Sequence, residues 1–276
     1  MSDAETTADT NAEAARVLDA LRPRRRARPR LAEPLHDARD LEVETPYGQV
    51  MAWRLDPWGS SGTAPATLLV HGWEDDNALW GALIDQLQHV GRPIVALDLP
   101  GHGFSPAEEC SIGRAAAAVR AVAEALGPVD SLVAHSFGCP VSVRAMADGL
   151  KIERAVLIAT PMPSARMASR WVRVKEAMDL SDEMVARVQA LAAEREAIFP
   201  PFDYPALAAG MIAKALLIHS LDDDDCEPEN SRVIADAWGG DTGSHADLQW
   251  TDSLGHRLVA QDAATLLGVV EFIERG

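Results

Sequence analysis

The sequence predicts an α/β fold, a three-layer sandwich in which helices cover both faces of a mostly parallel eight-stranded sheet. Short apolar runs alternate with helical patterns along most of the chain, which is typical of parallel strands joined by helices. The alternation begins after a hairpin pattern and is interrupted once, by a helical block after residue 160. A length of 276 residues with 47% apolar residues is enough for one such domain with a large core.

The elements can be placed in order from these patterns. Residues 40–45 and 49–54 alternate around Pro46-Tyr47-Gly48 and predict an antiparallel hairpin, which a Gly/Pro/Ser linker at 57–66 follows. Further strands are expected at 67–70, 94–97, 132–134, 155–158, 215–218 and 247–250. Helices are expected at 78–88, 112–126, 140–146, 231–238 and 261–275.

Two segments stand apart from this alternation. Residues 1–38 are interpreted as a mobile N-terminal arm, and residues 39–276 as the domain. Between about 161 and 206 the pattern changes to two helices, at 167–180 and 181–197, which predict a short cap beside the carboxyl ends of the strands. Six arginines between residues 22 and 30 predict a solvated arm stiffened by prolines, with a nucleic-acid contact as the alternative.

Composition narrows the classes of partner. A net charge of −17 disfavours nucleic acid and anionic membranes. The three cysteines form no CxxC pair, so neither a disulfide framework nor a zinc ribbon is expected. We expect no membrane span, because no apolar stretch approaches 18 residues, and the start of the chain lacks the pattern of a signal peptide. These features favour a cytoplasmic protein.

The segment Ala134-His135-Ser136-Phe137-Gly138 carries the strongest chemical signal. It lies between a predicted strand and a predicted helix, and small residues stand two positions on either side of the serine. This layout is typical of a nucleophile elbow, where a sharp turn holds the hydroxyl out from the backbone. The amide that follows, that of Phe137, would begin a helix and would be able to bind a developing oxyanion.

A nucleophilic serine needs a base and an acid that orients the base. His256 lies between the last predicted strand and the last helix, where a catalytic group belongs, although a structural loop histidine is the alternative. The acid is expected among Asp222, Asp223, Asp224 and Asp225, which follow the strand at 215–218. A calcium loop is a rival interpretation of that run, but its spacing and lack of glycine do not match an EF-hand loop.

In five segments the chain resembles the α/β-hydrolase family. They are 68–73 with His71-Gly72-Trp73, 98–105 with the pattern D-x-P-G-H-G-x-S, the elbow, the acid strand at 218–223, and Gly255-His256. The resemblance implies a triad in the order Ser136, Asp223, His256, because the family's aspartate falls four residues after a histidine, here His219. Ala134 and Ser220 stand where the family has glycine. The Asp run departs from the usual proline spacing, so Asp222 or Asp224 is the alternative acid.

The resemblance also implies acyl transfer. Ser136 would attack a carbonyl, His256 would move the proton, and the amides of Trp73 and Phe137 would form the oxyanion hole. It implies no metal and no organic cofactor. His71 and His102 would then order loops, and Asp98 would cap one.

The implied partner is a small-molecule substrate, and a carboxylic ester is expected because serine members of the fold most often cleave esters. A thioesterase, a lactonase, a hydrolase of carbon–carbon bonds and a non-catalytic binding protein are the alternatives. Trp73, Met162 and Trp171 are candidate substrate-binding residues for a small to medium hydrophobic acyl group, although packing of the cap on the core is the favoured interpretation of Met162 and Trp171 taken singly. The acidic residues 74–76 are expected to be solvated, to cap a helix or to bind a cationic substrate.

Overall fold

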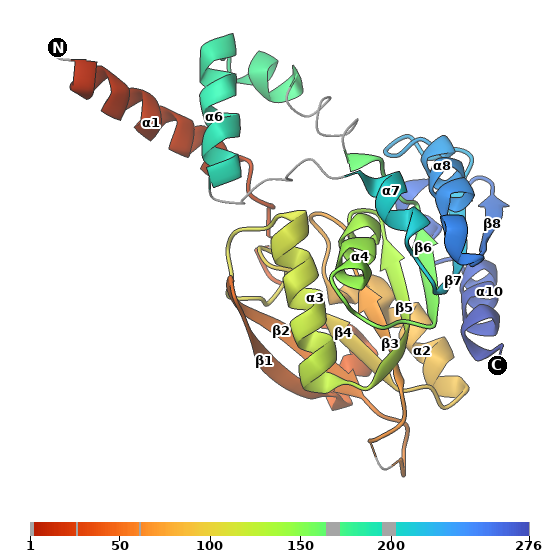
Figure 1. Cartoon of the computed structure of the whole chain (residues 1–276). Helices are drawn as coiled ribbons and strands as arrows, with labels where there is room; N and C mark the ends of the chain where they lie inside the picture. The colour runs from red at the N-terminus through yellow and green to blue at the C-terminus, as the bar shows by residue number, and fades with distance from the viewer. Residues whose placement is uncertain (1–2, 26, 61, 164–171, 195–202, 276) are drawn as a thin grey trace.

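The computed structural model describes residues 3–25, 27–60, 62–163, 172–194 and 203–275 (Figure 1). Within these residues eight strands form one sheet in the order β1-β2-β4-β3-β5-β6-β7-β8. The strands are β1 (Arg39–Thr45), β2 (Gly48–Leu55), β3 (Ala66–Val70), β4 (Ile94–Leu97), β5 (Val129–His135), β6 (Arg154–Ile158), β7 (Lys214–Ser220) and β8 (Ala246–Thr251). The predicted fold class is confirmed.

The order of the strands creates the crevice in which a ligand site is expected. β1 and β2 are antiparallel neighbours, β2 is antiparallel to β4, and the remaining pairs are parallel. β3 lies between β4 and β5, so the chain reverses its direction of winding after β4. Open α/β sheets bind ligands at the carboxyl ends of the strands beside such a reversal. Ser136 follows β5 at this point.

Helices cover both faces of the sheet (Figure 1). Successive side chains of β3 alternate between the two cores: Leu68 and Val70 pack with α3 and α4, whereas Leu69 packs with α2 and α10. All five residues of β3 are buried, which is why central strands read as continuous apolar runs. The covering helices are α2 (Gly81–His89), α3 (Ile112–Leu126), α4 (Gly138–Ala147), α8 (Glu229–Ala237) and α10 (Ala263–Glu274).

Shorter elements connect these layers. They are the 3₁₀ turns η1 (Glu33–Asp37), η2 (Asn77–Trp80) and η3 (Gly240–Thr242), and the helices α7 (Tyr204–Ala209) and α9 (Gly255–Leu258). In the cap, residues 172–177 are helical and α6 spans Asp182–Glu194. The first part of the predicted helix at 167–180 lies outside the described residues. No helix among the described residues is long and apolar enough to cross a membrane.

The N-terminal arm contains a helix that the sequence analysis did not predict. Helix α1 spans Asp3–Ala20 and lies beside α6 of the cap (Figure 1). The physical reason is an apolar stripe at Ala14, Val17, Leu18 and Leu21, whose spacing places all four on one face of a helix. Ala14, Val17 and Leu18 pack with Val188 and Ala192 of α6 in a small separate core.

The basic end of the arm is bound to the body of the protein. Arg22 forms ion pairs with Glu108 and Glu109 at 2.9 and 3.4 Å. Arg25 donates from Nε to the carbonyl oxygen of Gly101 at 3.1 Å. Two of the six arginines that were expected to be solvated are therefore used to attach the arm. The mobility of the arm stays a prediction.

Candidate active site

Ser136 occupies a strained turn between β5 and α4. Its φ is +51°, in the left-handed region that side chains rarely adopt, and such strain gathers at functional sites. Gly138 permits the turn, because a Cβ there would lie 2.4 Å from the carbonyl oxygen of Val70. Gly72 likewise leaves room for the serine, because a Cβ there would lie 3.0 Å from the Cβ of Ser136. The local geometry is that of the predicted elbow.

The structure brings together the three residues that the sequence assigned to a triad. Ser136 Oγ lies 2.9 Å from His256 Nε2, and His256 Nδ1 lies 2.7 Å from Asp223 Oδ2. A carboxylate only accepts, so Nδ1–H donates to Asp223 and Nε2 is left to accept the Ser136 hydroxyl proton. This tautomer is the one that a general base for Ser136 requires.

Asp223 is held by four donors at the end of β7. Its Oδ1 accepts the backbone amides of Asp225 and Cys226 at 2.9 and 2.8 Å. Its Oδ2 accepts from His219 Nε2 at 3.1 Å in addition to His256. Burial alone would raise the pKa of the Asp223 carboxyl, but the hydrogen bonds from both histidines lower it below the usual range. Asp223 therefore presents a fixed negative charge to His256.

The alternative acids have different surroundings. Asp222 is exposed, and its Oδ1 accepts the backbone amides of Leu254 and Gly255 at 3.2 and 3.0 Å. Asp222 therefore holds the backbone of the loop that carries His256, whereas Asp223 accepts from the imidazole. Asp224 is exposed and makes no hydrogen bond to that ring. Of these neighbouring carboxylates, Asp223, which the resemblance implies as the acid, is the one that contacts His256.

The charge state of His256 depends on this carboxylate. Partial burial alone would lower the pKa of the imidazole, but the hydrogen bond to Asp223, together with the nearby Cys226, raises it to about 9. The neighbouring His135 behaves in the opposite way, because burial, aided by the adjacent His256, lowers its pKa to about 4. Of these two histidines, His256 is the one that titrates near neutral or alkaline pH.

The candidate oxyanion residues flank the serine. Trp73 follows Gly72, whose missing Cβ leaves room for Ser136, and Phe137 is the first residue after the serine. Their rings meet edge to face with centroids 5.2 Å apart. The Phe137 amide lies at the N-terminal end of α4, where the helix dipole favours negative charge. Both residues lie beside Ser136, and their part in an oxyanion hole stays a prediction.

A buried network fixes the loop of Trp73. Asp98 Oδ1 accepts the backbone amide of Asn77 at 2.7 Å, and its Oδ2 accepts that of Phe104 at 2.7 Å. His71 Nε2 accepts the backbone amide of Leu99 at 2.9 Å. Burial, aided by the nearby His71, lowers the pKa of His102 to about 3, so this ring is neutral. Asp98, His71 and His102 thus have the loop-ordering surroundings that were expected.

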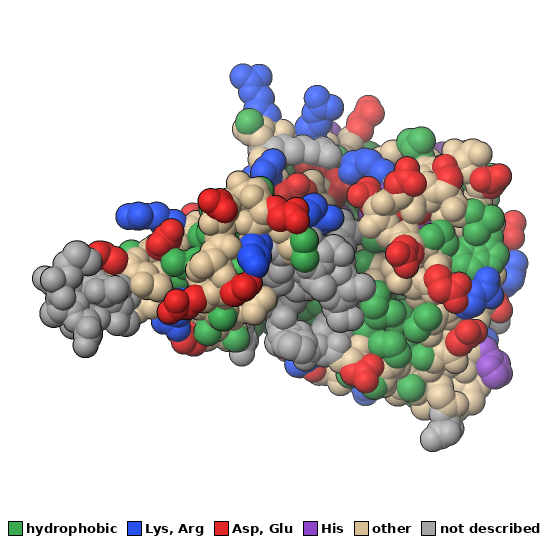
Figure 2. Space-filling view, turned by 90° about the horizontal axis from the view of Figure 1, so that it is seen from above, with side chains coloured by type: hydrophobic (Ala, Val, Ile, Leu, Met, Phe, Trp, Pro, Cys, Tyr) green, Lys and Arg blue, Asp and Glu red, His purple; other side chains and the backbone are tan. Residues whose placement is uncertain are grey.

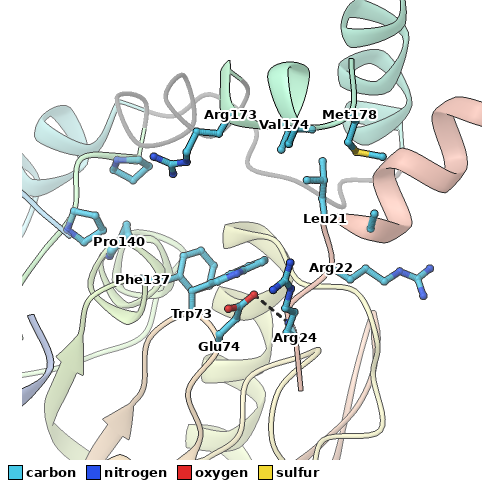
Figure 3. A pocket seen from close by; sticks show the side chains of 14 residues that line it. Leu21, Arg22, Arg24, Trp73, Glu74, Phe137, Pro140, Arg173, Val174 and Met178 are labelled. Carbon is cyan, nitrogen blue, oxygen red and sulfur yellow. Dashed lines mark hydrogen bonds between the residues drawn. The ribbon is translucent and has the colours of Figure 1, made fainter. Parts of the chain in front are cut away.

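A cavity of about 570 Å³ lies between the arm, the cap and the elbow (Figure 3). Phe137 and Trp73 contribute to its wall next to Ser136, which is itself 4% exposed. The complete lining is Ala20, Leu21, Arg22, Arg24, Trp73, Glu74, Phe137, Pro140, Pro161, Pro163, Arg173, Val174, Ala177 and Met178. This size and its mixed surface are typical of small-molecule sites.

Two of the three predicted substrate-binding residues can be located. Trp73 lines the cavity, whereas Met162 packs against the core on the α3 and α4 face, and the prolines on either side of it line the cavity instead. Trp171 lies outside the described residues. Sequence reasoning missed the arm residues in the wall. The apolar spacing at 14, 17, 18 and 21 could have indicated that the arm docks, but of the wall residues only Leu21 belongs to it.

The residues that the structure describes form no cluster typical of a metal centre. Among the described part of the chain, no three His, Cys, Asp or Glu side chains are grouped as metal ligands would be. In the Asp run after β7, the Asp222 carboxylate accepts backbone amides, and the Asp223 carboxylate accepts backbone amides and two histidines.

Comparison with known proteins agrees with this geometry. The sequence profile described as "Alpha/beta hydrolase family" matches residues 67–269. The chain belongs to this family. This α/β hydrolase is 33% identical over 105 residues to the pimeloyl-[acyl-carrier protein] methyl ester esterase of Methylococcus capsulatus. That match spans 37% of this chain and 40% of the relative.

Solved structures share the fold of this α/β hydrolase. An esterase of Pyrococcus furiosus superposes with a TM-score of 0.70 at 16% identity, covering 92% of this chain and 99% of that one. The carboxylesterase CesB of Bacillus subtilis gives 0.63 at 16% identity over 97% and 99%. A thioesterase domain from the curacin biosynthetic pathway gives 0.61 at 20% identity over 85% and 99%. At these identities the likeness is one of fold.

Proposed function

We propose that this α/β hydrolase cleaves carboxylic esters of small to medium, hydrophobic acyl groups through an acyl-enzyme. The observation that carries the proposal is the continuous hydrogen-bonded chain from Ser136 Oγ through His256 to Asp223, placed beside a cavity of about 570 Å³. A serine without this chain would be a weak nucleophile at neutral pH.

The proposed reaction uses these residues in turn. Ser136 Oγ forms a bond to the ester carbonyl carbon while its proton passes to His256 Nε2. The oxyanion of the tetrahedral intermediate is held by the amides of Phe137 and Trp73, and each such donor is typically worth about 100- to 1000-fold in rate. His256 then protonates the leaving alcohol, the ester bond breaks, and water repeats the sequence on the acyl-enzyme to release the acid and restore Ser136.

Hydrolysis of a p-nitrophenyl ester series, with chains from acetate upward, tests the proposal. We expect turnover that Ser136→Ala abolishes and that the matched variant Ser60→Ala, on an exposed turn, leaves unchanged. A fluorophosphonate should label wild type and Ser60→Ala but not Ser136→Ala. Thioester and lactone substrates in the same assay separate the other acyl-transfer chemistries. Absence of both turnover and labelling would contradict the proposal and favour a binding protein that keeps the fold.

A further inference from the structure

The cavity beside Ser136 is lined by cationic side chains that ester hydrolysis alone does not require. Its lining holds three arginines and one acidic residue, Glu74, whereas the chain as a whole has a net charge of −17. Figure 2 looks down on the end of the molecule that carries the cap and shows acidic side chains scattered over that face. A cavity lined by arginines in so acidic a protein needs an explanation.

The three arginines are not equivalent. Arg22 is neutralised by Asp19, Glu108 and Glu109, and Figure 3 shows its guanidinium pointing away from the cavity. Arg24 and Arg173 form no ion pair or side-chain hydrogen bond with any residue that the structure describes. Two guanidinium groups are therefore left to act on whatever occupies the cavity.

Arg24 and Arg173 approach the cavity from different segments. Figure 3 shows Arg24 beside Trp73 at the level of the elbow, and Arg173 extending from the cap toward the side that carries Pro140. The backbone amide of Arg24 donates to Glu74 Oε1 at 3.2 Å, which fixes the arm against the loop of Trp73. Among the described residues, no ion pair joins the Glu74 carboxylate to the Arg24 guanidinium.

The rest of the wall is apolar. Phe137 and Trp73 form its floor, and Leu21, Val174 and Met178 form the side away from Pro140 (Figure 3). A ligand that matches both parts has an apolar chain and a negatively charged end, since guanidinium groups bind planar oxyanions through paired hydrogen bonds. With two unpaired arginines and one glutamate, the wall carries a net charge of about +1, which a singly charged carboxylate balances better than a doubly charged phosphate.

We infer that the preferred substrate is an ester with a carboxylate at the end of an apolar chain, and that the unpaired charges of Arg24 and Arg173 attract this carboxylate into the cavity. The inference rests on the proposed function, because it assigns the substrate class of the same site. It makes these two arginines specificity-determining residues that act on the carboxylate of the substrate and not on its reacting carbonyl.

Matched substrates test this assignment. In the first pair, two p-nitrophenyl esters carry either a terminal carboxylate or the neutral isosteric carboxamide on the acyl chain. In the second pair, two esters of an alkyl alcohol carry the same two groups on the alcohol. We expect wild type to prefer the carboxylate by about tenfold in kcat/KM in one of the two pairs, since a charge-assisted hydrogen bond at a partly exposed site is worth about that factor. The pair that shows the preference identifies the side of the ester that occupies the cavity.

Variants assign the preference to the two arginines. Arg24→Gln and Arg173→Gln should each reduce the preference, and the double variant should remove it, because each change should lower kcat/KM for the carboxylate esters more than for the carboxamide esters. Arg173→Lys should retain part of the preference because it keeps the charge. Arg120→Gln, which removes an equal charge from the exposed surface of α3, is the control and should have no effect. Raising the salt concentration should weaken the preference, because exposed charges are screened.

Binding separates this inference from the proposed function. The same pairs are titrated calorimetrically into Ser136→Ala, which keeps the cavity but not the nucleophile. Tighter binding of the carboxylate, lost with Arg24→Gln and Arg173→Gln in that background, supports the inference even if wild type turned over no ester. Equal binding and equal kcat/KM of carboxylate and carboxamide in both pairs would overturn it, while leaving esterase activity intact.

Discussion

Arg257 forms an ion pair with Asp75, and the pair joins the two loops that flank Ser136. Arg257 follows His256 directly, and Asp75 lies two residues after Trp73. The Asp75 side chain is 4% exposed, so its charge needs a partner, because burying an unpaired carboxylate is costly. The expectation that residues 74–76 are solvated is therefore wrong for Asp75, while Asp76 caps η2 as the alternative expectation had it.

Breaking this ion pair should misplace both loops at once. We expect Asp75→Asn to lower kcat about tenfold and to destabilise the fold by about 1–2 kcal/mol, a value reduced because Arg257 is 44% exposed. Urea unfolding and steady-state kinetics measure the two effects. A double-mutant cycle with Arg257→Gln should give a coupling energy of at least about 0.5 kcal/mol. Strict additivity of the two changes would show that the pair does not couple the loops.

The pH dependence of hydrolysis should report His256. Neutral imidazole is needed to accept the Ser136 proton, and Asp223 raises the pKa of His256 to about 9. Activity should therefore be low at acid pH, rise through the raised pKa and level off on the alkaline side. The profile of kcat/KM against pH for a neutral ester measures this.

Replacing the acid should shift that profile in a known direction. Asp223→Asn removes the hydrogen-bonded carboxylate that raises the pKa of His256, so the rising limb should move to lower pH. The plateau rate should also fall by about 1000- to 10,000-fold, because the imidazole loses its orientation and the partner for its charge. An unchanged limb in Asp223→Asn would mean that another group controls the profile.

His135 should act as a positioning residue for His256. Its Nε2 lies 2.8 Å from the backbone carbonyl oxygen of His256, to which it donates, and the two rings have centroids 4.9 Å apart. His135→Phe keeps a ring but removes the donor, so we expect kcat to fall about tenfold with little change in KM. His135→Gln places an amide donor near the Nε2 position and should recover part of the loss. A purely structural role would instead lower the stability of both variants without separating their kcat values.

The sequence predicted the parts of the site that depend on local pattern. Ser136 lies in a strand, turn and helix pattern that five consecutive residues reveal, and the order Ser136, Asp223, His256 follows from the family resemblance. The cavity wall was not predictable in the same way, because it combines the arm, the cap and the elbow. Arg187 of α6 donates to Asn11 of α1 at 2.6 Å across 176 positions, and no local pattern indicates that pairing.

The docking of helix α1 of the arm on α6 of the cap can be tested directly. Val17 is 3% exposed and packs with α6, whereas Ala12 is exposed on the same helix. Val17→Asp should undock α1, because it removes about 2 kcal/mol of apolar burial and places a charge in the small core. The matched variant Ala12→Asp introduces the same charge on the exposed side and should leave the arm docked.

Limited proteolysis and amide hydrogen exchange in α1 measure the docking, and hydrolysis of long-chain esters measures its consequence. We expect Val17→Asp to be cleaved faster in the arm, to exchange faster in α1 and to lose preference among chain lengths, since Ala20 and Leu21 line the cavity. The main core should keep its stability, because the buried residues of α1 pack in a separate cluster. Equal cleavage of the two variants and wild type would mean that α1 is not held by this core and that the arm is mobile in solution.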